Sequence, residues 1–514
     1  MDEIIDAVAD AIPKFNEFLL VTFVKKQIED APLFIDMCLR EAVKLNSGAV
    51  EYLGYEVVRP EERAAFEIGK TTKRISFWVS ELLLMRYRFK HEGRVIDPPS
   101  YIYVPYLVDN MLVIKSKLFA IHKGISEQIF SRRQEKHGDG IMIRPIRARI
   151  PFARKHSYLM KSVTSPYSAT EFIVTAGLHH KVGSKSSIDK TIILYLLCKF
   201  GFQNVLFQFG IPEGTLWFCE HVNQEDTAGE YFPAKKITKT SQRTMFLRVD
   251  KSVLENRLWR KVIANILYTL VYFDFQTVDD MQDPSGSVFR VMLGKIIAPN
   301  DKHASQILHA RNTADTHLAS VDIFLDPITR LRFNRFGVKV DDIYQLLYYV
   351  FVEIDNIMVN SSPQDLYTKR IDVTDTILIK AYAEMIFRNF YRANQRFHLR
   401  GKEVSSLLKF KAMAIDAAYS SRRRGAGKTI STAPSIYNDS WLVSCGIFKN
   451  HPAGSAEQRF HPSMAFVESL VAFSGENIGQ TGSLNPCCVI DEDGGIDRQD
   501  YCADIDALLP YLPK

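Results

Sequence analysis

The chain has 514 residues, of which 46% are hydrophobic and 24% are charged. Both fractions are close to the averages for folded soluble proteins, which excludes a disordered, collagen-like or low-complexity chain. The 65 lysines and arginines exceed the 59 aspartates and glutamates, for a net charge of only +6. We therefore expect any contact with nucleic acid to be confined to patches. The length predicts about three structural units.

The seven cysteines include no C-x-x-C pair. This sparse, odd-numbered set predicts free and mostly buried thiols in a reducing compartment. The N-terminus is acidic and lacks the charged-then-apolar pattern of a signal peptide. The most apolar windows, 192–211 and 262–275, are interrupted by polar residues or are too short to cross a bilayer, so we expect no membrane segment.

The first third of the chain is expected to begin with helices and to continue with strands. Dense apolar positions with interleaved basic residues predict that residues 3–90 are mostly helical. β-Branched and aromatic residues predict strands over 101–119. Alternating apolar and basic residues predict one strand over 141–152. Its arginines most simply mark a solvated face, with nucleic-acid contact as the alternative, and they are Arg144, Arg147 and Arg149.

Apolar periodicity predicts the main helices of the remaining chain. They are expected at 187–202, 254–273, 343–354 and 378–392. The first should end at Gly201, a residue type favoured at helix C-termini. A turn is expected at 283–286, and loop-rich structure after residue 421.

Familiar catalytic signatures are missing from the sequence, which has no H-E-x-x-H, G-x-S-x-G or G-x-G-x-x-G motif. The stretch 425–429 ends like a phosphate-binding loop, but Arg422 stands where that motif needs its first glycine. His179 and His180 have no cluster of further ligands. The remaining carboxylates lack the paired spacing of a two-metal site, and they are Asp279, Asp280, Asp355 and the run 491–493.

A basic corridor in the C-terminal third stands out, with few acidic residues among its cations. Aromatic residues such as Phe397 and Tyr419 are interleaved with them. Such a segment can contact a phosphate backbone, but charge alone favours a solvated surface equally. The corridor consists of Arg388, Arg392, Arg396, Arg400, Lys402, Lys409, Lys411, Arg422, Arg423, Arg424 and Lys428.

The stretch 336–392 has the order of features found in one large enzyme family. A leucine-rich helix (DDIYQLLYYVFVEID) is followed by a loop with Asp365, by Lys369-Arg370, and by a second helix ending FRNFYR. This stretch resembles the N-terminal half of the β-type subunit of multisubunit DNA-directed RNA polymerases. Two positions depart from the family pattern: Thr368 replaces an asparagine and Asp375 replaces a helix glycine.

Two further segments, 104–133 and 187–202, resemble the same family in the same order. His461-Pro462-Ser463 and residues 475–486 stand where the family has its fork segment, although the family's Pro-Glu-Gly motif is absent. The length is similar to that of the N-terminal β polypeptide in the split-subunit polymerases of giant bacteriophages.

The resemblance implies a mixed α/β (α+β), multi-domain fold of the polymerase β protrusion and lobe type. The expected divisions are a first protrusion part at 1–160, a lobe at 161–335, a second protrusion part with the basic loop at 336–440, and a fork-like, loop-rich segment at 441–514.

The resemblance also implies a function: an N-terminal β-like subunit of a phage multisubunit DNA-dependent RNA polymerase, forming one wall of the DNA channel. A non-enzymatic virion structural or nucleic-acid-packaging protein is the alternative. The implied partners are a C-terminal β-like subunit, β′-like subunits, template DNA and nascent RNA, with no membrane. The expected location is the cytoplasm of the infected bacterial host, or also the virion.

No catalytic residue and no metal ligand is expected in this chain, because the family's metal-binding aspartates belong to the β′-type subunit, which would hold the Mg²⁺. The isolated chain should therefore be inactive. The residues expected to contact nucleic acid are Lys369, Arg370, Arg396, Arg400, Arg422, Arg423, Arg424 and Lys428.

Overall fold

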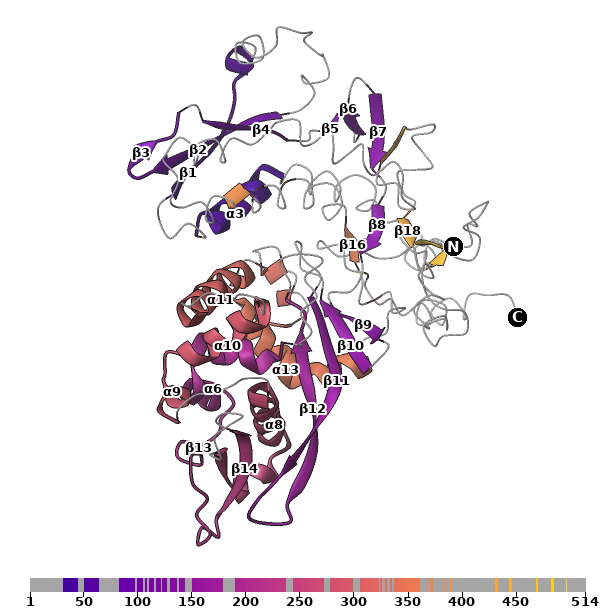
Figure 1. Ribbon diagram of the computed structural model, residues 1–514. Helices are drawn as coiled ribbons and strands as arrows, with labels where there is room; N and C mark the ends of the chain where they lie inside the picture. The colour runs from indigo at the N-terminus through magenta and orange to yellow at the C-terminus, as the bar shows by residue number, and fades with distance from the viewer. Residues whose placement is uncertain are drawn as a thin grey trace, which may run out of the picture. The chain divides into compact units, whose positions relative to one another are not determined.

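Figure 1 shows the computed structural model of the chain. It describes residues 31–44, 50–63, most of 83–178 and of 190–360, and short stretches between 367 and 496. The chain divides into two compact units. Unit 1 consists of Met1–Gln128 and Ser362–Lys514, and unit 2 is Ile129–Ser361. The four divisions expected from the resemblance stay a prediction.

Unit 1 begins with helix α3 (Ala31–Val43) and an antiparallel sheet. Its strands are β1 (Val50–Val57), β2 (Leu83–His91), β3 (Arg94–Val95) and β4 (Ser100–Val104). Strand β2 alternates from Met85 to Phe89: Met85, Tyr87 and Phe89 are buried, whereas Arg86 and Arg88 pair with a glutamate of β1. The expectation of mostly helical structure over residues 3–90 is therefore wrong for β1 and β2, because a period of two dominates these segments.

Residues of the second helix expected from the sequence pack against this sheet. Tyr382, Ile386 and Phe390 are buried, as their spacing of four residues predicts. The hydroxyl of Tyr382 donates a hydrogen bond to the backbone oxygen of Tyr103 at 2.8 Å. The rings of Phe390 and Phe89 have centroids 6.0 Å apart.

Unit 1 contains two further sheets built from short strands. The first has the order β17-β7-β6-β5 and the second the order β16-β8-β18-β20-β19. Their strands are β5 (Leu107–Val108), β6 (Met111–Ile114), β7 (Lys117–Ile121), β8 (Lys123–Ser126), β16 (Arg370–Asp372), β17 (Ile430–Thr432), β18 (Val443–Cys445), β19 (Glu468–Ser469) and β20 (Gly482–Leu484). Strands expected over 101–119 are thus present.

Unit 2 opens with an antiparallel sheet of order β12-β11-β10-β9. Its strands are β9 (Phe130–Glu135), β10 (Gly138–Ile143), β11 (Ile150–Lys161) and β12 (Ser168–Ala176). The single strand expected over 141–152 is wrong, because this segment forms parts of β10 and β11, with Ile143 opposite Ile150. Pro145 lacks a backbone donor and disfavours a continuous central strand. The three arginines at 144, 147 and 149 lie outside the described residues.

A second, three-stranded sheet of unit 2 has the order β13-β15-β14. Its strands are β13 (Leu216–Cys219), β14 (Gly229–Lys236) and β15 (Thr244–Asp250). The helices that accompany the two sheets are α5 (Ile192–Phe200), α6 (Phe202–Gln208), α7 (Lys251–Glu255), α8 (Arg257–Val271), α9 (Val278–Gln282), α10 (Ser287–Ile297), α11 (Gln306–Asp322) and α13 (Ile343–Asn360).

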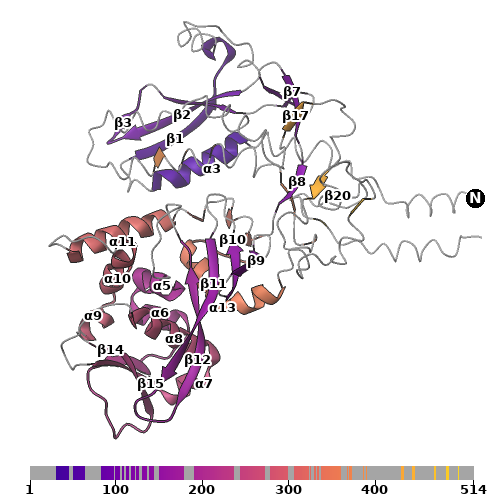
Figure 2. The same ribbon diagram turned by 45° about the vertical axis from the view of Figure 1, so that its right-hand side comes forward.

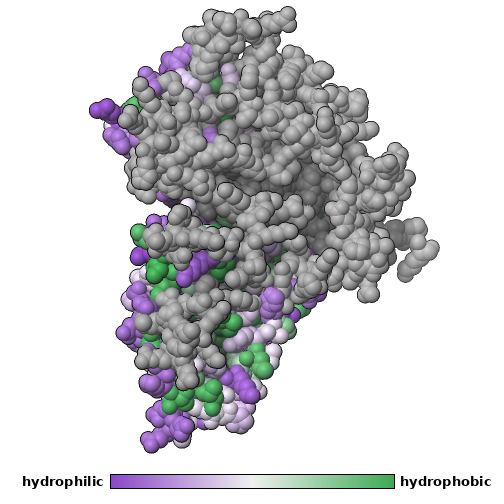
Figure 3. Space-filling model, viewed as in Figure 1, coloured by the Kyte–Doolittle hydropathy of each residue, from purple (hydrophilic) through white to green (hydrophobic). Residues whose placement is uncertain are grey.

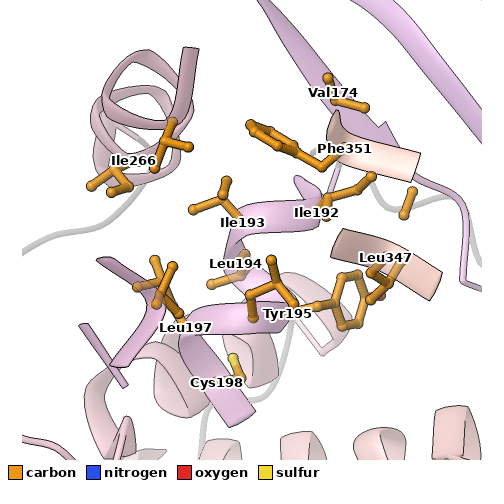
Figure 4. Close-up of a cluster of buried hydrophobic side chains, with 14 of the residues drawn as sticks. Val174, Ile192, Ile193, Leu194, Tyr195, Leu197, Cys198, Ile266, Leu347 and Phe351 are labelled. Carbon is orange, nitrogen blue, oxygen red and sulfur yellow. The ribbon is translucent and has the colours of Figure 1, made fainter. Parts of the chain in front are cut away.

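Helix α5 forms the centre of the unit 2 core. Every residue from Ile192 to Cys198 is at most 1% exposed, so apolar neighbours surround the helix on all sides. Figure 4 shows its side chains between Ile266 of α8 and Leu347 and Phe351 of α13. Burial raises the pKa of the Cys198 thiol, as expected for a free cysteine in a core.

The ends of the core helices follow from local hydrogen bonding. Thr191 caps α5, because its Oγ1 accepts a hydrogen bond from the backbone N–H of Leu194 at 3.1 Å. The helix therefore starts later than the expected residue 187, and it ends at Gly201, which has a φ of 76°. Asp342 caps α13 through backbone N–H groups of residues 344 and 345. The expected turn at 283–286 is present, with Gly286 in the left-handed region.

Candidate nucleic-acid interface

Arg370, expected to contact nucleic acid, occupies a defined position in a sheet. Strand β16 pairs antiparallel with β8, so that Arg370 lies opposite Ser126 and Asp372 lies opposite Gly124. The pairing joins chain segments about 245 residues apart, which no local pattern in the sequence predicts. The backbone of Arg370 is thereby held by ladder hydrogen bonds.

The same sheet also contains three short strands from the C-terminal part of the chain. Strand β18 pairs parallel with β8, and β20 and β19 follow in order. In this sheet Ser444 of β18 lies opposite Gly124 of β8 and Ser483 of β20, and Ser483 lies opposite Ser469 of β19.

The basic tip of the corridor, Arg422 to Lys428, leads directly into strand β17. This strand pairs with β7, and Ile430 lies opposite Ile121. Figure 2 shows β17 alongside β7 and β20 near β8. Because Ile121 and Ser126 are only five residues apart, the chain limits the distance between the Cα atoms of Ile430 and Arg370 to about 30 Å. The structure thus places the first residue of β17 in the same region as the backbone of Arg370.

The remaining residues expected to contact nucleic acid are not placed by the structure. Of Arg370, the backbone position alone is described. The others lie outside the described residues, and they are Lys369, Arg396, Arg400, Arg422, Arg423, Arg424 and Lys428.

Comparison with known proteins identifies the family. A family model described as a non-virion RNA polymerase subunit matches residues 1–407, which is well over half of the chain. The chain belongs to this family. No curated protein matches it. The matched region of this polymerase subunit includes the whole of unit 2 and Arg370, and it ends before the basic tip.

Asp355, one of the carboxylates singled out in the sequence of this polymerase subunit, lies beside two arginines. Asp355 of α13 pairs with Arg154 of β11 at 2.6 Å, and Arg257 lies 4.0 Å from its other oxygen. Nearby, the ammonium of Lys261 donates to the backbone oxygen of Phe351 at 2.8 Å, and burial lowers its pKa. These contacts join α8 and α13 to the sheet.

The other candidate ligands do not form a metal centre in the described part of the chain. Asp279 and Asp280 lie in the first turn of α9, where a negative charge favours the helix dipole. His179, His180 and the run 491–493 lie outside the described residues. Among the described residues, no three His, Cys, Asp or Glu side chains are grouped closely enough to hold a metal ion. No helix in the described part is long and apolar enough to span a bilayer.

A cluster that the sequence did not reveal lies on the outer face of the three-stranded sheet in the polymerase subunit. Arg248 of β15 is almost buried and pairs with Asp226 and Asp250. Its guanidinium lies 4.1 Å from the ring centroid of Trp217. The strand pattern TMFLRVD contains both Arg248 and Asp250, but Asp226 comes from a loop and the indole of Trp217 from β13.

Proposed function

We propose that this chain is the N-terminal β-like subunit of a phage multisubunit DNA-dependent RNA polymerase and forms one wall of the DNA channel. The family match over residues 1–407 carries the proposal. The three segments that resemble the β-type subunit, 104–133, 187–202 and 336–392, all lie within the matched region and keep the family's order.

The proposed contacts with template DNA and nascent RNA lie in unit 1. Arg370 belongs to β16, which pairs with β8, and the basic tip precedes β17 in the sequence, which pairs with β7. Neighbouring cations add salt-dependent contacts to phosphate groups. The proposed nucleic-acid-binding residues are Lys369, Arg370, Arg396, Arg400, Arg422, Arg423, Arg424 and Lys428.

Nucleotidyl transfer in this proposal takes place in the assembled enzyme. A β′-like subunit holds the Mg²⁺ ions that activate and stabilise the reacting oxygens. A C-terminal β-like subunit completes the channel, and this chain alone makes no RNA. Its own contribution is the positioning of nucleic acid.

The family description also bears on when the subunit acts. A non-virion polymerase acts in the infected cell, which supports transcription of phage genes in the bacterial cytoplasm. It argues against a virion structural or nucleic-acid-packaging protein, the alternative function.

Site-specific photo-crosslinking tests the channel-wall proposal. A benzophenone amino acid at position 370 or 423 of the assembled polymerase should crosslink to DNA or RNA in an elongation complex. Position 207 provides the control, because Phe207 is 82% exposed in unit 2 and lies outside the proposed interface. Equal crosslinking from all three positions, or none from 370 and 423, would contradict the proposal.

A further inference from the structure

The three-stranded sheet of unit 2 has one buried and one partly open face. Alternation places Phe218, Phe232 and Leu247 on the inner face, where all three are at most 1% exposed. By register, the outer face has one row made of Trp217, Arg248 and Tyr231. A second row is made of Cys219, Phe246 and Pro233.

Trp217 lies on a rigid polar support. The Nε atom of Arg248 donates to Asp226 at 2.8 Å, and its Nη1 atom donates to Asp250. The hydroxyl of Tyr231 donates to the same Asp226 carboxylate at 3.1 Å. Arg248 therefore has little freedom beneath the indole, whose ring centroid is 4.1 Å from the guanidinium carbon.

The indole is held in place and yet accessible. The side chain of Arg248 is 8% exposed, whereas Trp217 is 36% exposed. Tryptophan and arginine are the residues most enriched among the strongest contributors to protein interfaces. An aromatic ring fixed before binding loses little conformational entropy when a partner covers it.

The surroundings of Trp217 favour a protein segment over a nucleic acid. The second row of the outer face is apolar and incompletely buried, and Pro233 in it is exposed. The rim beside β13 is acidic, because Glu213, Glu220 and Glu225 are exposed near the ends of this strand and in the following loop, whereas the opposite edge strand β14 ends in Lys235 and Lys236. The positive charge of Arg248 is already balanced by two carboxylates. Lys251, which follows β15, pairs with Glu230. A phosphate backbone would meet repulsion at the rim beside β13.

We propose that the outer face around Trp217 is a docking surface for an apolar segment with lysine or arginine residues on another subunit of the same polymerase. The apolar residues of that segment cover the indole and Phe246, and its cations face the acidic rim. This inference rests on membership of a polymerase subunit family, because it requires a multisubunit assembly. Figure 3 shows apolar residues at the surface of unit 2 among hydrophilic ones.

Photo-crosslinking in the assembled polymerase identifies the occupant. A benzophenone amino acid in place of Phe246, which is half-buried beside Trp217, should crosslink to a different polymerase subunit. The crosslinked peptide should be apolar and contain lysine or arginine. Crosslinks to DNA or RNA, crosslinks to a second copy of this chain, or no crosslinks would each overturn the inference.

Variants of the full chain test how much this surface contributes to the affinity for the other subunits. Trp217→Ala should weaken association with the other subunits about 10- to 30-fold. The double variant Glu220→Lys and Glu225→Lys should weaken it several-fold, most strongly at low salt. Phe207→Ala removes another exposed aromatic residue of unit 2 and should leave association unchanged.

Circular dichroism of each variant establishes that the chain is folded. If folded Trp217→Ala chain assembles as tightly as the wild type, the docking surface is wrong. The proposed function has a separate readout, because RNA synthesis by the complete polymerase can persist when this one contact is weakened.

Discussion

The side chain of Asn265 in α8 hydrogen-bonds to the backbone of Val174 in the edge strand β12. The side-chain oxygen of Asn265 accepts a hydrogen bond from the backbone N–H of Val174 at 3.0 Å. Its amide nitrogen donates to the backbone oxygen of Phe172 at 3.1 Å. Asn265 is fully buried, so these bonds replace contacts that an exposed edge would make with water. The helix thus continues the hydrogen-bonding pattern of the sheet.

Asn265→Leu should destabilise the chain by about 2–4 kcal/mol, because buried backbone groups of β12 lose their partners. Denaturant unfolding of the full chain measures the loss, and hydrogen exchange at the Val174 amide should accelerate. Asn204→Leu is the matched control, since Asn204 is exposed and donates one bond, to the oxygen of Phe200. Equal costs for the two variants would contradict the edge-closing role.

Gly294→Ala should separate helices α10 and α11. A Cβ atom on Gly294 would lie 1.9 Å from the backbone oxygen of Ala310, and backbone cannot move aside as a flexible side chain can. We expect a loss of about 2 kcal/mol or more in unfolding free energy. Gly210→Ala is the control: its φ is +70° and the space around it is open, so backbone strain alone should cost about 1 kcal/mol. A smaller loss at Gly294 than at Gly210 would refute the close approach.

The hydrogen bonds between Arg248 and Asp226 beneath Trp217 should make the free energy of unfolding depend on pH in the acidic range. Hydrogen bonds from Arg248 hold the pKa of the Asp226 carboxyl well below its usual range. The folded state therefore binds this proton less readily than the unfolded state, and the stabilisation is present above the unfolded pKa of about 4. It is lost as pH falls through the lower folded pKa.

Asp226→Asn should lower the melting temperature, and the difference from the wild type should be constant above about pH 5. Below about pH 4 the two melting curves should converge. Glu225→Gln, a change at a neighbouring exposed carboxylate, should show no such convergence. A gap that stays constant down to pH 2 would exclude Asp226 as the titrating group.

The arginines of the basic tip should contribute to holding nucleic acid. Replacing Arg422, Arg423 and Arg424 by alanine should shorten the lifetime of elongation complexes. It should also flatten their salt dependence by about one unit of logarithmic slope per lost phosphate contact. The measurement is complex lifetime against salt concentration. An unchanged slope would mean that these arginines make no phosphate contacts and belong to a solvated loop.

Local patterns predicted helices of unit 2 at 187–202 and 343–354, whereas the single helix expected at 254–273 is divided into α7 and α8, and α10 and α11 were not predicted. Thr191, Gly201 and Asp342 act within one turn of their own helix, so the sequence near each end contains the relevant information. The buried stripe of Tyr382 and Ile386 was predictable for the same reason. The strand character of β2 was missed because apolar residues interleaved with arginines fit both a helix and a strand over a short window.

The features that the sequence did not predict depend on contacts between segments that are far apart along the chain. The sequence marked Arg370 as basic, but its position opposite Ser126 depends on a pairing between distant segments. Asn265 was visible as one polar residue in an apolar helix, with no sign of the strand edge that it closes. The support of Trp217 likewise needs Asp226, Arg248 and Asp250 from a loop and a neighbouring strand.

Reconstitution of the polymerase from purified subunits, with and without this chain, tests whether RNA synthesis requires the chain. The measured quantity is promoter-independent RNA elongation on a preformed template and primer. RNA synthesis is expected from the complete set of subunits, and none when this chain is omitted or assayed alone. Undiminished elongation in its absence would contradict the claim that the chain is an integral subunit of the transcribing enzyme.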